Sequence, residues 1–411
     1  MGELVAAIDI GTSKVCALCG QINKAGYVET LARASVPCFG VRKGLIVDIE
    51  GVAAAISGAV RQVETAAGAR IASAYVNVMG LHVDVFANRA STAVAGENRE
   101  ISRSDVERLM YSIRNIEIPG GAQIIDVIPR QFIIDGYNGI TEPLGMIGAN
   151  VELEADVVVG RITSIANIVK CVEASGFKID GLVISGQALS EIILSREEME
   201  MGVILIDVGG GATDISVFKD GRMFLYESLL VGGEHITNDI SIALKIPYAD
   251  AERIKKEYNL ALTSLIRKDQ ELYLNDINDN SRKRVYISEV VEVIEARMYE
   301  IMSMCRQVLI ANRVEFNFGA GVVLTGGGAA FFDGNRQIAN AVFGLPVRAY
   351  PDRSYKNQGA ESTLAEGIVK HVARMGKGAR YGSDVQLLKS REPGAGPNIF
   401  VKFIDLLRRL F

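Results

Sequence analysis

A short pattern occurs twice in this chain, each time directly after an apolar run. The first copy reads Asp9-Ile10-Gly11-Thr12-Ser13-Lys14, and the second reads Asp207-Val208-Gly209-Gly210-Gly211-Ala212-Thr213-Asp214. Each apolar run predicts a strand that ends at an aspartate, and the small residues after it expose backbone N–H groups in a turn that can bind anionic oxygens. Two such loops facing each other can hold the phosphates of a nucleotide and a divalent cation.

The elements around the two loops repeat as well. Each half predicts strand, hairpin, strand and helix, over residues 15–21, 27–36 and 48–67 in the first half and 215–218, 222–231 and 234–244 in the second. We interpret this order as an internal duplication, in which each half contributes one domain of an α/β protein.

Composition limits the possible classes of protein. With 411 residues, 49% of them apolar, the chain can form at least two domains with sizeable cores. A net charge of −5 gives no basic surface, so no nucleic-acid partner is expected. Five scattered cysteines are typical of reduced thiols in a cytosolic protein. Because Asp9 interrupts the N-terminal apolar segment, neither a signal peptide nor a transmembrane helix is expected.

Two further motifs can belong to the same site. Gly326-Gly327-Gly328 follows an apolar run, and Glu252 and Lys255 share one face of a predicted helix. Alone, a glycine run is often only a tight turn and such an ion pair is often only a solvated one. Together with the two aspartate loops, and in this order, they favour a nucleotide site whose adenosine side they line.

On these motifs the chain resembles the superfamily of actin, Hsp70 and the sugar kinases. The resemblance implies an actin-like α/β ATPase fold, in which two related domains flank a nucleotide cleft, with ATP and Mg²⁺ as cofactors. It implies that Asp9 and Asp207 hold the magnesium ion through water. The nucleotide-binding residues that it implies are Gly11, Thr12, Ser13, Lys14, Gly209, Gly210, Gly211, Thr213, Gly233, Glu252, Lys255, Gly326, Gly327 and Gly328.

A catalytic base for hydrolysis is harder to assign. In the superfamily the group that activates water comes from the segment between the domains or from the second aspartate loop, which here suggests Gln187, Asp207 or Asp214. A polar residue such as Gln187 at a crossover can also be purely structural. We therefore expect at most a weak ATPase.

The actin-like core is complete without residues 83–160, and we predict that these residues form an inserted α+β subdomain. Its predicted strands are residues 83–87, 93–95, 124–128, 131–134 and 151–159, with a turn at 135–139. A helix is expected to begin at Ser102 or Ser104, with Asp105 in its first turn.

The insertion narrows the resemblance to one family. The strings Asp126-Val127-Ile128-Pro129-Arg130-Gln131-Phe132-Ile133-Ile134-Asp135-Gly136 and Pro143-Leu144-Gly145-Met146 resemble the bacterial division actin FtsA; Glu142, where the family usually has Asp, is a conservative departure. The resemblance implies that the insertion contacts neighbouring subunits and later division proteins.

The C-terminal region predicts a tethered amphipathic helix. Residues 377–397 are rich in Gly, Ser, Lys, Arg and Pro, as flexible linkers are, and residues 398–411 place apolar side chains along one helical stripe with basic ones opposite. This pattern favours an interfacial helix on an anionic phospholipid membrane, although the stripe can also dock on the protein's own core or on a partner. The predicted membrane residues are Phe400, Phe403, Ile404, Leu407, Leu410, Phe411, Lys402, Arg408 and Arg409.

The resemblance also implies a division of the chain. Its parts are a first core subdomain (1–82, 161–198 and 366–376), the insertion (83–160), a second core subdomain (199–236 and 318–365), a small subdomain (237–317), a linker (377–397) and the terminal helix (398–411).

The function that the resemblance implies is an ATP-binding protein that polymerises and tethers the FtsZ ring to the cytoplasmic face of the cell membrane at the division site. The C-terminal peptide of FtsZ is expected on the small subdomain, where Arg297 and Arg306 of a predicted helix can meet acidic groups. Two alternatives remain. One is a pilus-assembly adaptor with the same core and insertion, against which the tethered helix argues; the other is a small-molecule kinase, for which no polar substrate pocket is evident.

Overall fold

The computed structural model describes residues 2–23, 25–78, 83–96, 98–278, 281–328, 332–351 and 362–375. The predicted linker and C-terminal helix, with all the predicted membrane residues, lie outside the described residues. In the described ranges, no helix has the length and apolar character needed to cross a membrane.

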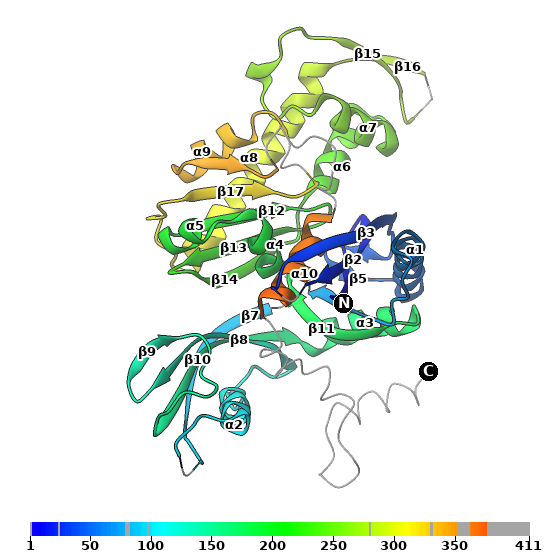
Figure 1. Ribbon diagram of the computed structural model, residues 1–411. Coiled ribbons are helices and arrows are strands. Elements are labelled where there is room, and N and C mark those ends of the chain that lie inside the picture. Colours follow the sequence, from blue (N-terminus) through cyan, green and yellow to red (C-terminus); the bar gives the residue numbers. More distant parts are fainter. Residues whose placement is uncertain are drawn as a thin grey trace.

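The first core domain is built on a five-stranded sheet. Its strands are β1 (Glu3–Ile10), β2 (Lys14–Ile22), β3 (Val28–Pro37), β6 (Ser73–Val78) and β11 (Lys178–Ile184), in the order β11-β6-β1-β2-β3. Helices α1 (Ile49–Ala67) and α3 (Ile162–Ala174) pack on one face of the sheet, and α10 (Thr363–Met375) packs on the other (Figure 1). A short hairpin, β4 (Val41–Arg42) and β5 (Leu45–Ile46), precedes α1.

Local signals explain the limits of α1. The Asp48 side chain accepts a hydrogen bond from the Gly51 N–H at the start of the helix, and Gly68 ends it in the left-handed conformation (φ +63°). The strands predicted at 15–21 and 27–36 and the helix predicted at 48–67 are thereby confirmed.

The second core domain repeats the first. Its sheet has the order β14-β13-β12-β17-β18. The strands are β12 (Val203–Val208), β13 (Thr213–Lys219), β14 (Arg222–Leu229), β17 (Gly321–Thr325) and β18 (Val347–Ala349). As β1 does with β2 and β6, β12 pairs antiparallel with β13 and parallel with β17. The predicted duplication is confirmed at the level of sheet topology.

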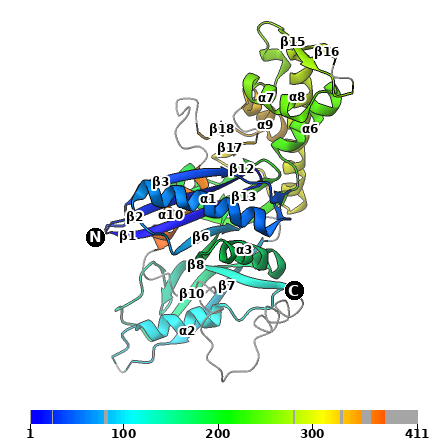
Figure 2. The ribbon, with the colours of Figure 1, turned by 90° about the vertical axis from the view of Figure 1, so that its right-hand side faces the viewer.

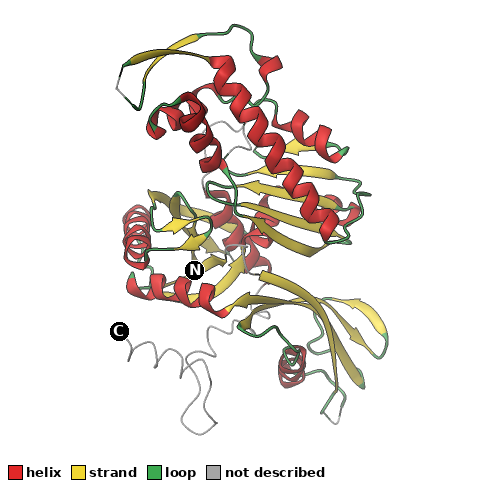
Figure 3. Ribbon diagram, turned by 180° about the vertical axis from the view of Figure 1, so that it is seen from behind, coloured by secondary structure: helices red, strands yellow, loops and turns green. Residues whose placement is uncertain are grey.

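Helices and a hairpin extend the second domain (Figure 2). These elements are α6 (Gly233–Leu244), α7 (Tyr248–Tyr258), the 3₁₀ turn Thr263–Leu265, β15 (Glu271–Asn275), β16 (Arg282–Tyr286), α8 (Ile287–Ala311) and α9 (Asn335–Phe343). Figure 3 shows α8 running across one face of the second sheet. Its buried residues, among them Ile294, Met298 and Leu309, belong to the same core as Ile206 and Leu324 of the sheet.

The insertion forms a four-stranded antiparallel sheet with one helix. The strand order is β7-β10-β8-β9, from β7 (Val83–Ala93), β10 (Asn150–Arg161), β8 (Ala122–Ile134) and β9 (Tyr137–Ile140). Helix α2 (Arg103–Ile113) begins after Ser102, whose backbone N–H donates to the Asp105 carboxylate at 2.8 Å. Ser102 rather than Ser104 is therefore the N-cap.

The strands predicted at 83–87, 124–128, 131–134 and 151–159 are confirmed, but the breaks placed between strands are wrong. β7 continues from Val83 to Ala93, because it pairs with β10 along its whole length, and residues 94–95 are not strand. β8 is continuous through 124–134: Pro129, which lacks an N–H, lies opposite Ala155 at a register shift, where a strand tolerates proline. Residues 137–139, predicted as part of a turn at 135–139, belong to β9, which pairs with β8.

The chain crosses between the two core domains through α4 (Ser185–Ile193) and α5 (Arg196–Met201), and returns after β18. Arg348 of β18 joins the two crossings, because its guanidinium donates to the Ile193 carbonyl at 2.7 Å and pairs with the Glu198 carboxylate at 2.7 Å. The second domain is thus fastened to the segment that leaves the first.

Candidate nucleotide-binding site

The two aspartate loops close with the same backbone hydrogen bond. In the first, the Gly11 N–H donates to the Lys14 carbonyl at 2.9 Å, and in the second the Gly209 N–H donates to the Ala212 carbonyl at 2.9 Å. Each loop is the turn of a hairpin, β1–β2 or β12–β13, and both line one large cleft of about 2230 Å³. The structure therefore brings the two predicted loops together.

The loops also approach each other closely. A Cβ added to Gly211 would lie 2.7 Å from the Thr12 Cγ2 atom, and one added to Gly210 would lie 3.6 Å from the Ser13 hydroxyl. Gly11, Thr12, Ser13, Lys14, Gly209 and Gly210 line the cleft, whereas Gly211 and Thr213 do not. Thr213 is fully buried, and its hydroxyl donates to the Val231 carbonyl at 2.8 Å.

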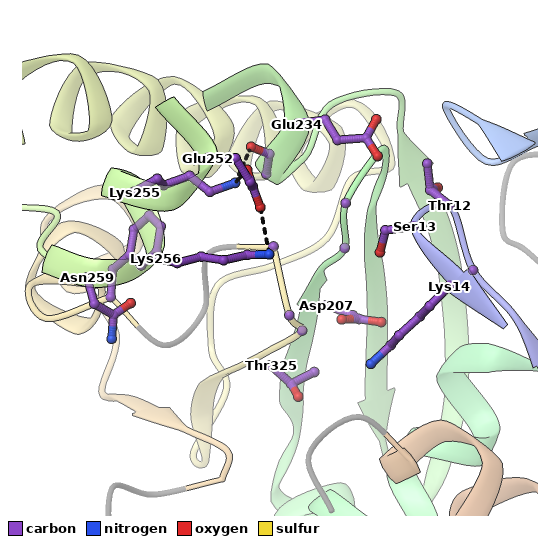
Figure 4. Close-up of a pocket in the computed structure, with 18 of the residues that line it drawn as sticks. Thr12, Ser13, Lys14, Asp207, Glu234, Glu252, Lys255, Lys256, Asn259 and Thr325 are labelled. Carbon is purple, nitrogen blue, oxygen red and sulfur yellow. Dashed lines mark hydrogen bonds and ion pairs between the residues drawn. The ribbon is translucent and has the colours of Figure 1, made fainter. Parts of the chain in front are cut away.

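Two carboxylates, the buried Asp9 and the half-buried Asp207, lie at the strand ends behind the loops. Burial raises the pKa of Asp9 to about 7, against the opposing effect of the Lys14 ammonium. Burial, together with the charges of Asp214 and Asp9, raises the pKa of Asp207 to about 7, and Lys14 again opposes the shift. Figure 4 shows the Lys14 side chain extending toward Asp207 across the cleft. Unpaired negative charge at this depth is stabilised by a bound cation.

The donor set fits magnesium and phosphate. Magnesium prefers carboxylate, phosphate and water oxygens and keeps much of its hydration, and two carboxylates leave most of its six positions free for water and phosphate. The loops supply hydroxyls, backbone N–H groups and one ammonium, which are donors suited to phosphate oxygens.

The three suggested catalytic groups differ in their position. Asp207 and Asp214 line the cleft, and Gln187, near the start of α4, is buried and is not part of the lining. Burial raises the pKa of Asp214, while hydrogen bonds from the Ser228 and Tyr226 hydroxyls oppose the shift. Its carboxylate is thus already held by two donors.

The third glycine cluster packs against the second aspartate loop. A Cβ on Gly328 would lie 1.9 Å from the Gly209 carbonyl oxygen, and one on Gly233 would lie 2.4 Å from the Gly328 carbonyl oxygen. Gly326 has a φ of +102°, which only glycine adopts readily. All three glycines of the cluster line the cleft, and so does Gly233.

Glu252 and Lys255 form the predicted pair on α7, at 2.6 Å. Lys255 is 4% exposed, and its ammonium also donates to the Thr237 hydroxyl at 2.6 Å and to the Gly233 carbonyl at 3.0 Å. Lys255 therefore ties α7 to the start of α6. Glu252 also pairs with Lys256 at 2.9 Å, at the edge of the cleft (Figure 4).

The sequence did not point to several lining residues. Asn77 and Thr325 end β6 and β17, which are equivalent strands of the two domains. Glu234, Lys256 and Asn259 also line the cleft (Figure 4). The duplication itself is the signal that could have revealed Asn77 and Thr325, because strands equivalent by topology end at the same edge of the cleft.

The two arginines predicted to bind a partner already have neighbours within the chain. Arg297 of α8 pairs with Asp239 of α6 and with Glu300. The Arg306 guanidinium lies over the Phe316 ring, 5.2 Å from its centroid. An acidic peptide would have to compete with these contacts, and the role of both arginines stays a prediction.

Comparisons with known proteins identify relatives over most of the chain. The sequence model of the family described as "Cell division protein FtsA" matches residues 204–371, and that of the "SHS2 domain inserted in FTSA" matches residues 80–159. Cell division protein FtsA of Bacillus subtilis (strain 168) is 35% identical over 372 residues, which is 90% of this chain and 84% of the relative. The protein of the same name from Pseudomonas aeruginosa is 32% identical over 347 residues, 84% and 82% of the two chains.

Solved structures show the fold. A PilM-PilN type IV pilus biogenesis complex aligns with a TM-score of 0.57 at 14% identity, over 90% of this chain and 98% of that one. MreB5 of Spiroplasma citri bound to ADP aligns with a TM-score of 0.54 at 14% identity, over 94% and 99%. The predicted actin-like architecture with an inserted subdomain is confirmed.

Proposed function

Since the chain belongs to the FtsA family of cell-division proteins, we propose that it binds ATP with magnesium, polymerises, and tethers the FtsZ ring to the cytoplasmic face of the membrane. The observation that supports nucleotide binding most directly is the pair of matching aspartate loops, with Asp9 buried and Asp207 half-buried behind them in one cleft. Polymerisation and the tethering of the FtsZ ring to the membrane are proposed from the resemblance to the FtsA family.

The cleft residues have distinct roles in this proposal. The Thr12 and Ser13 hydroxyls and the Lys14 ammonium bind phosphate oxygens from the first domain, and the backbone N–H groups of Gly209 and Gly210 bind them from the second. Asp9 and Asp207 hold the hydrated magnesium ion, which neutralises phosphate charge when bound. Because both domains contact the same phosphates, the bound nucleotide favours the closed cleft.

Hydrolysis is a weak activity in this proposal. Asp207 and Asp214 line the cleft, but Asp214 already accepts hydrogen bonds from Tyr226 and Ser228, and Gln187 lies outside the lining. Because Asp207 is assigned to the magnesium ion in this proposal, none of these three groups is free to activate water. The nucleotide then acts mainly by favouring the closed, assembly-competent form.

Membrane attachment depends on the tail. The stripe of Phe400, Phe403, Leu407 and Leu410, with basic residues opposite, matches an interfacial helix. Each basic side chain near an anionic surface contributes about 1 kcal/mol, so one helix binds reversibly. Several copies on one filament give stable attachment, because linked sites bind with higher combined affinity. Later division proteins would bind the inserted subdomain.

One experiment tests the tether. The protein is mixed with ATP, magnesium, anionic vesicles and FtsZ filaments, and the FtsZ that sediments with lipid is measured for the full chain and for a truncation that ends at Pro397. We expect FtsZ with lipid only in the presence of the full chain. If the full chain binds lipid but does not bring FtsZ, the division role is wrong and a pilus adaptor becomes the leading account. ATP turnover that rises on addition of sugars would instead indicate a kinase.

A further inference from the structure

Two sets of polar contacts meet at the junction between the domains. In the first domain, the Ile10 N–H donates to the Asn77 Oδ1 atom at 2.7 Å, and the Asn77 Nδ2 group lies 3.5 Å from the Ser185 Oγ atom. In the second domain, the Tyr226 hydroxyl donates to the Asp214 carboxylate at 2.8 Å. The first set runs from β1 to the start of α4, and the second from β14 to β13.

The two sets meet where α4 packs against Tyr226. Helix α4 begins at Ser185 of the first domain, and Tyr226 lies on β14 of the second. The domains approach so closely here that a Cβ on Gly186 would lie 2.1 Å from the Ser216 Oγ atom and 3.0 Å from the Tyr226 ring. This contact therefore places the α4 backbone directly against the Ser216 and Tyr226 side chains.

An apolar core surrounds this contact. Leu189 and Ile193 of α4 belong to the same buried cluster as Leu205, Phe218 and Tyr226 of the second sheet. Tyr226 is 4% exposed, so water does not compete freely for its hydroxyl. A hydrogen bond to a charged group in such surroundings is stronger than one at the surface.

Tyr226 can influence the cleft only through its neighbours. Ser185, Asp207 and Asp214 line the cleft, whereas Tyr226 does not. Asp214 lies opposite Asp207 in the β12–β13 register, so the position of one carboxylate affects the field at the other. In the first domain the position equivalent to Asp214 is Cys16, opposite Asp9. This second carboxylate, with its tyrosine, is therefore particular to the second domain.

We infer that Tyr226 is a positioning residue, whose hydroxyl holds Asp214 in place and couples the cation-binding carboxylates to the crossover helix α4. The inference rests on the proposed binding of a magnesium nucleotide in the cleft. It explains how the presence of the cation can affect the junction between the domains: a change at Asp207 and Asp214 is passed through Tyr226 to Gly186, and so to α4.

The test compares Tyr226→Phe with the full-length wild-type chain. A fluorescent ATP analogue is titrated with Mg²⁺ and, separately, with EDTA, and the ratio of the two affinities is the magnesium-dependent gain. We expect Tyr226→Phe to lower this gain about tenfold, the effect of losing a hydrogen bond to a charged group, while affinity in EDTA changes little. In the nucleotide-free protein, α4 amides should exchange with deuterium faster in Tyr226→Phe than in wild type.

Two further variants keep the inference falsifiable. Tyr286→Phe removes a similar hydrogen bond, from the Tyr286 hydroxyl to Glu271 at 3.2 Å, outside the cleft, and should leave the gain unchanged. Gly186→Ala disturbs the same junction from the first domain, because its Cβ would meet the Tyr226 ring, so adding it to Tyr226→Phe should cause little additional loss of the gain.

The outcomes distinguish a failure of this inference from a failure of the proposed function. Equal losses of affinity with and without magnesium, or an unchanged gain in Tyr226→Phe, overturn the inference alone. Additive effects of Gly186→Ala and Tyr226→Phe also overturn it, because the two positions then act independently. A wild-type chain that binds no ATP under either condition overturns the proposed function and the inference together.

Discussion

The two aspartate loops share one backbone hydrogen bond but offer different chemistry. Both close with a glycine N–H donating to a carbonyl three residues later at 2.9 Å. At the positions that follow, the first loop has Thr12, Ser13 and Lys14, and the second has Gly210, Gly211 and Ala212. Duplication has thus kept the turn, while the side-chain donors are all on one side of the cleft.

The difference follows from what surrounds each loop. Parts of the second loop are crowded, since a Cβ on Gly328 would lie 1.9 Å from the Gly209 oxygen and one on Gly211 would lie 2.7 Å from the Thr12 Cγ2 atom. At Gly211 and at the neighbouring Gly328, a side chain has no room. Substitutions around the second loop should therefore act through steric fit and stability, and substitutions in the first loop through lost ligand contacts.

The largest expected effect is on the packing of the second loop. Gly328→Ala should lower the free energy of unfolding by about 3 kcal/mol, because its Cβ would meet backbone that cannot move aside easily. Urea denaturation measures the loss. Gly327→Ala is the matched control: no atom lies within 4 Å of its added Cβ, so it should change stability by less than about 1 kcal/mol. Equal effects of the two substitutions would contradict the steric account.

The next prediction concerns the carboxylates that the loops share. The folded pKa of Asp9 is raised to about 7 from 3.8, so the folded nucleotide-free protein binds a proton that the unfolded chain has lost between these values. The stabilising contribution of the protonated form is complete below pH 3.8 and is lost as the pH rises through about 7.

Asp9→Asn should remove this part of the pH dependence. At pH 8 the nucleotide-free variant should be more stable than wild type by about 2 kcal/mol, and near pH 4 the two should be alike. Thermal unfolding across this pH range, in EDTA, makes the measurement. Asp207→Asn should behave in the same way. A variant with the wild-type pH profile would show that the Asp9 carboxylate does not titrate differently in the folded protein.

A smaller effect is expected from the side-chain donors of the first loop. Lys14→Ala should weaken ATP binding about tenfold, through loss of one charge-assisted contact to phosphate, with little change in stability. Isothermal titration measures the affinity. Lys219→Ala, at the end of β13 and outside the cleft lining, removes the same charge and should leave binding unchanged. If both variants lose affinity equally, the effect comes from net charge and not from the loop.

The smallest expected effect tests the difference between the two loops directly. Thr12→Gly gives the first loop the residue that the second has at Gly210, and it should weaken ATP binding about threefold through loss of one neutral hydrogen bond. Thr12→Ser keeps the hydroxyl and should bind within about twofold of wild type. Binding by Thr12→Gly at wild-type strength would mean that the turn alone, without the hydroxyl, suffices.

Much of the local structure was predictable because its signals are local. Asp48 and Gly68 mark the ends of α1, and apolar runs mark β1 and β12. In the insertion, where pairing decides strand continuity, the prediction divided β7 and β8. A proline or a polar stretch indicates a break in sequence, but a long partner such as β10 keeps the strand continuous.

The candidate site likewise combines features that the sequence predicts with features that only the fold creates. The aspartate loops, the Gly326–Gly328 cluster and the Glu252–Lys255 pair carry recognisable patterns, and the structure brings them to one cleft. Asn77 and Tyr226 carry none. Their roles arise from partners 67 and 12 residues away in sequence, Ile10 and Asp214, which only the folded sheets bring within hydrogen-bond distance.

By itself, the sequence determined the repeated strand–loop–strand units, the caps of the helices and the membership of a family, because these depend on the order of residues along the chain. Only the tertiary structure decided which loop residues face the cleft, that Lys255 holds α6 and that Arg297 is already paired with Asp239. Those outcomes depend on burial and on distances between segments far apart in sequence, and burial is what makes a shared proton, a cation or a single hydroxyl matter at this site.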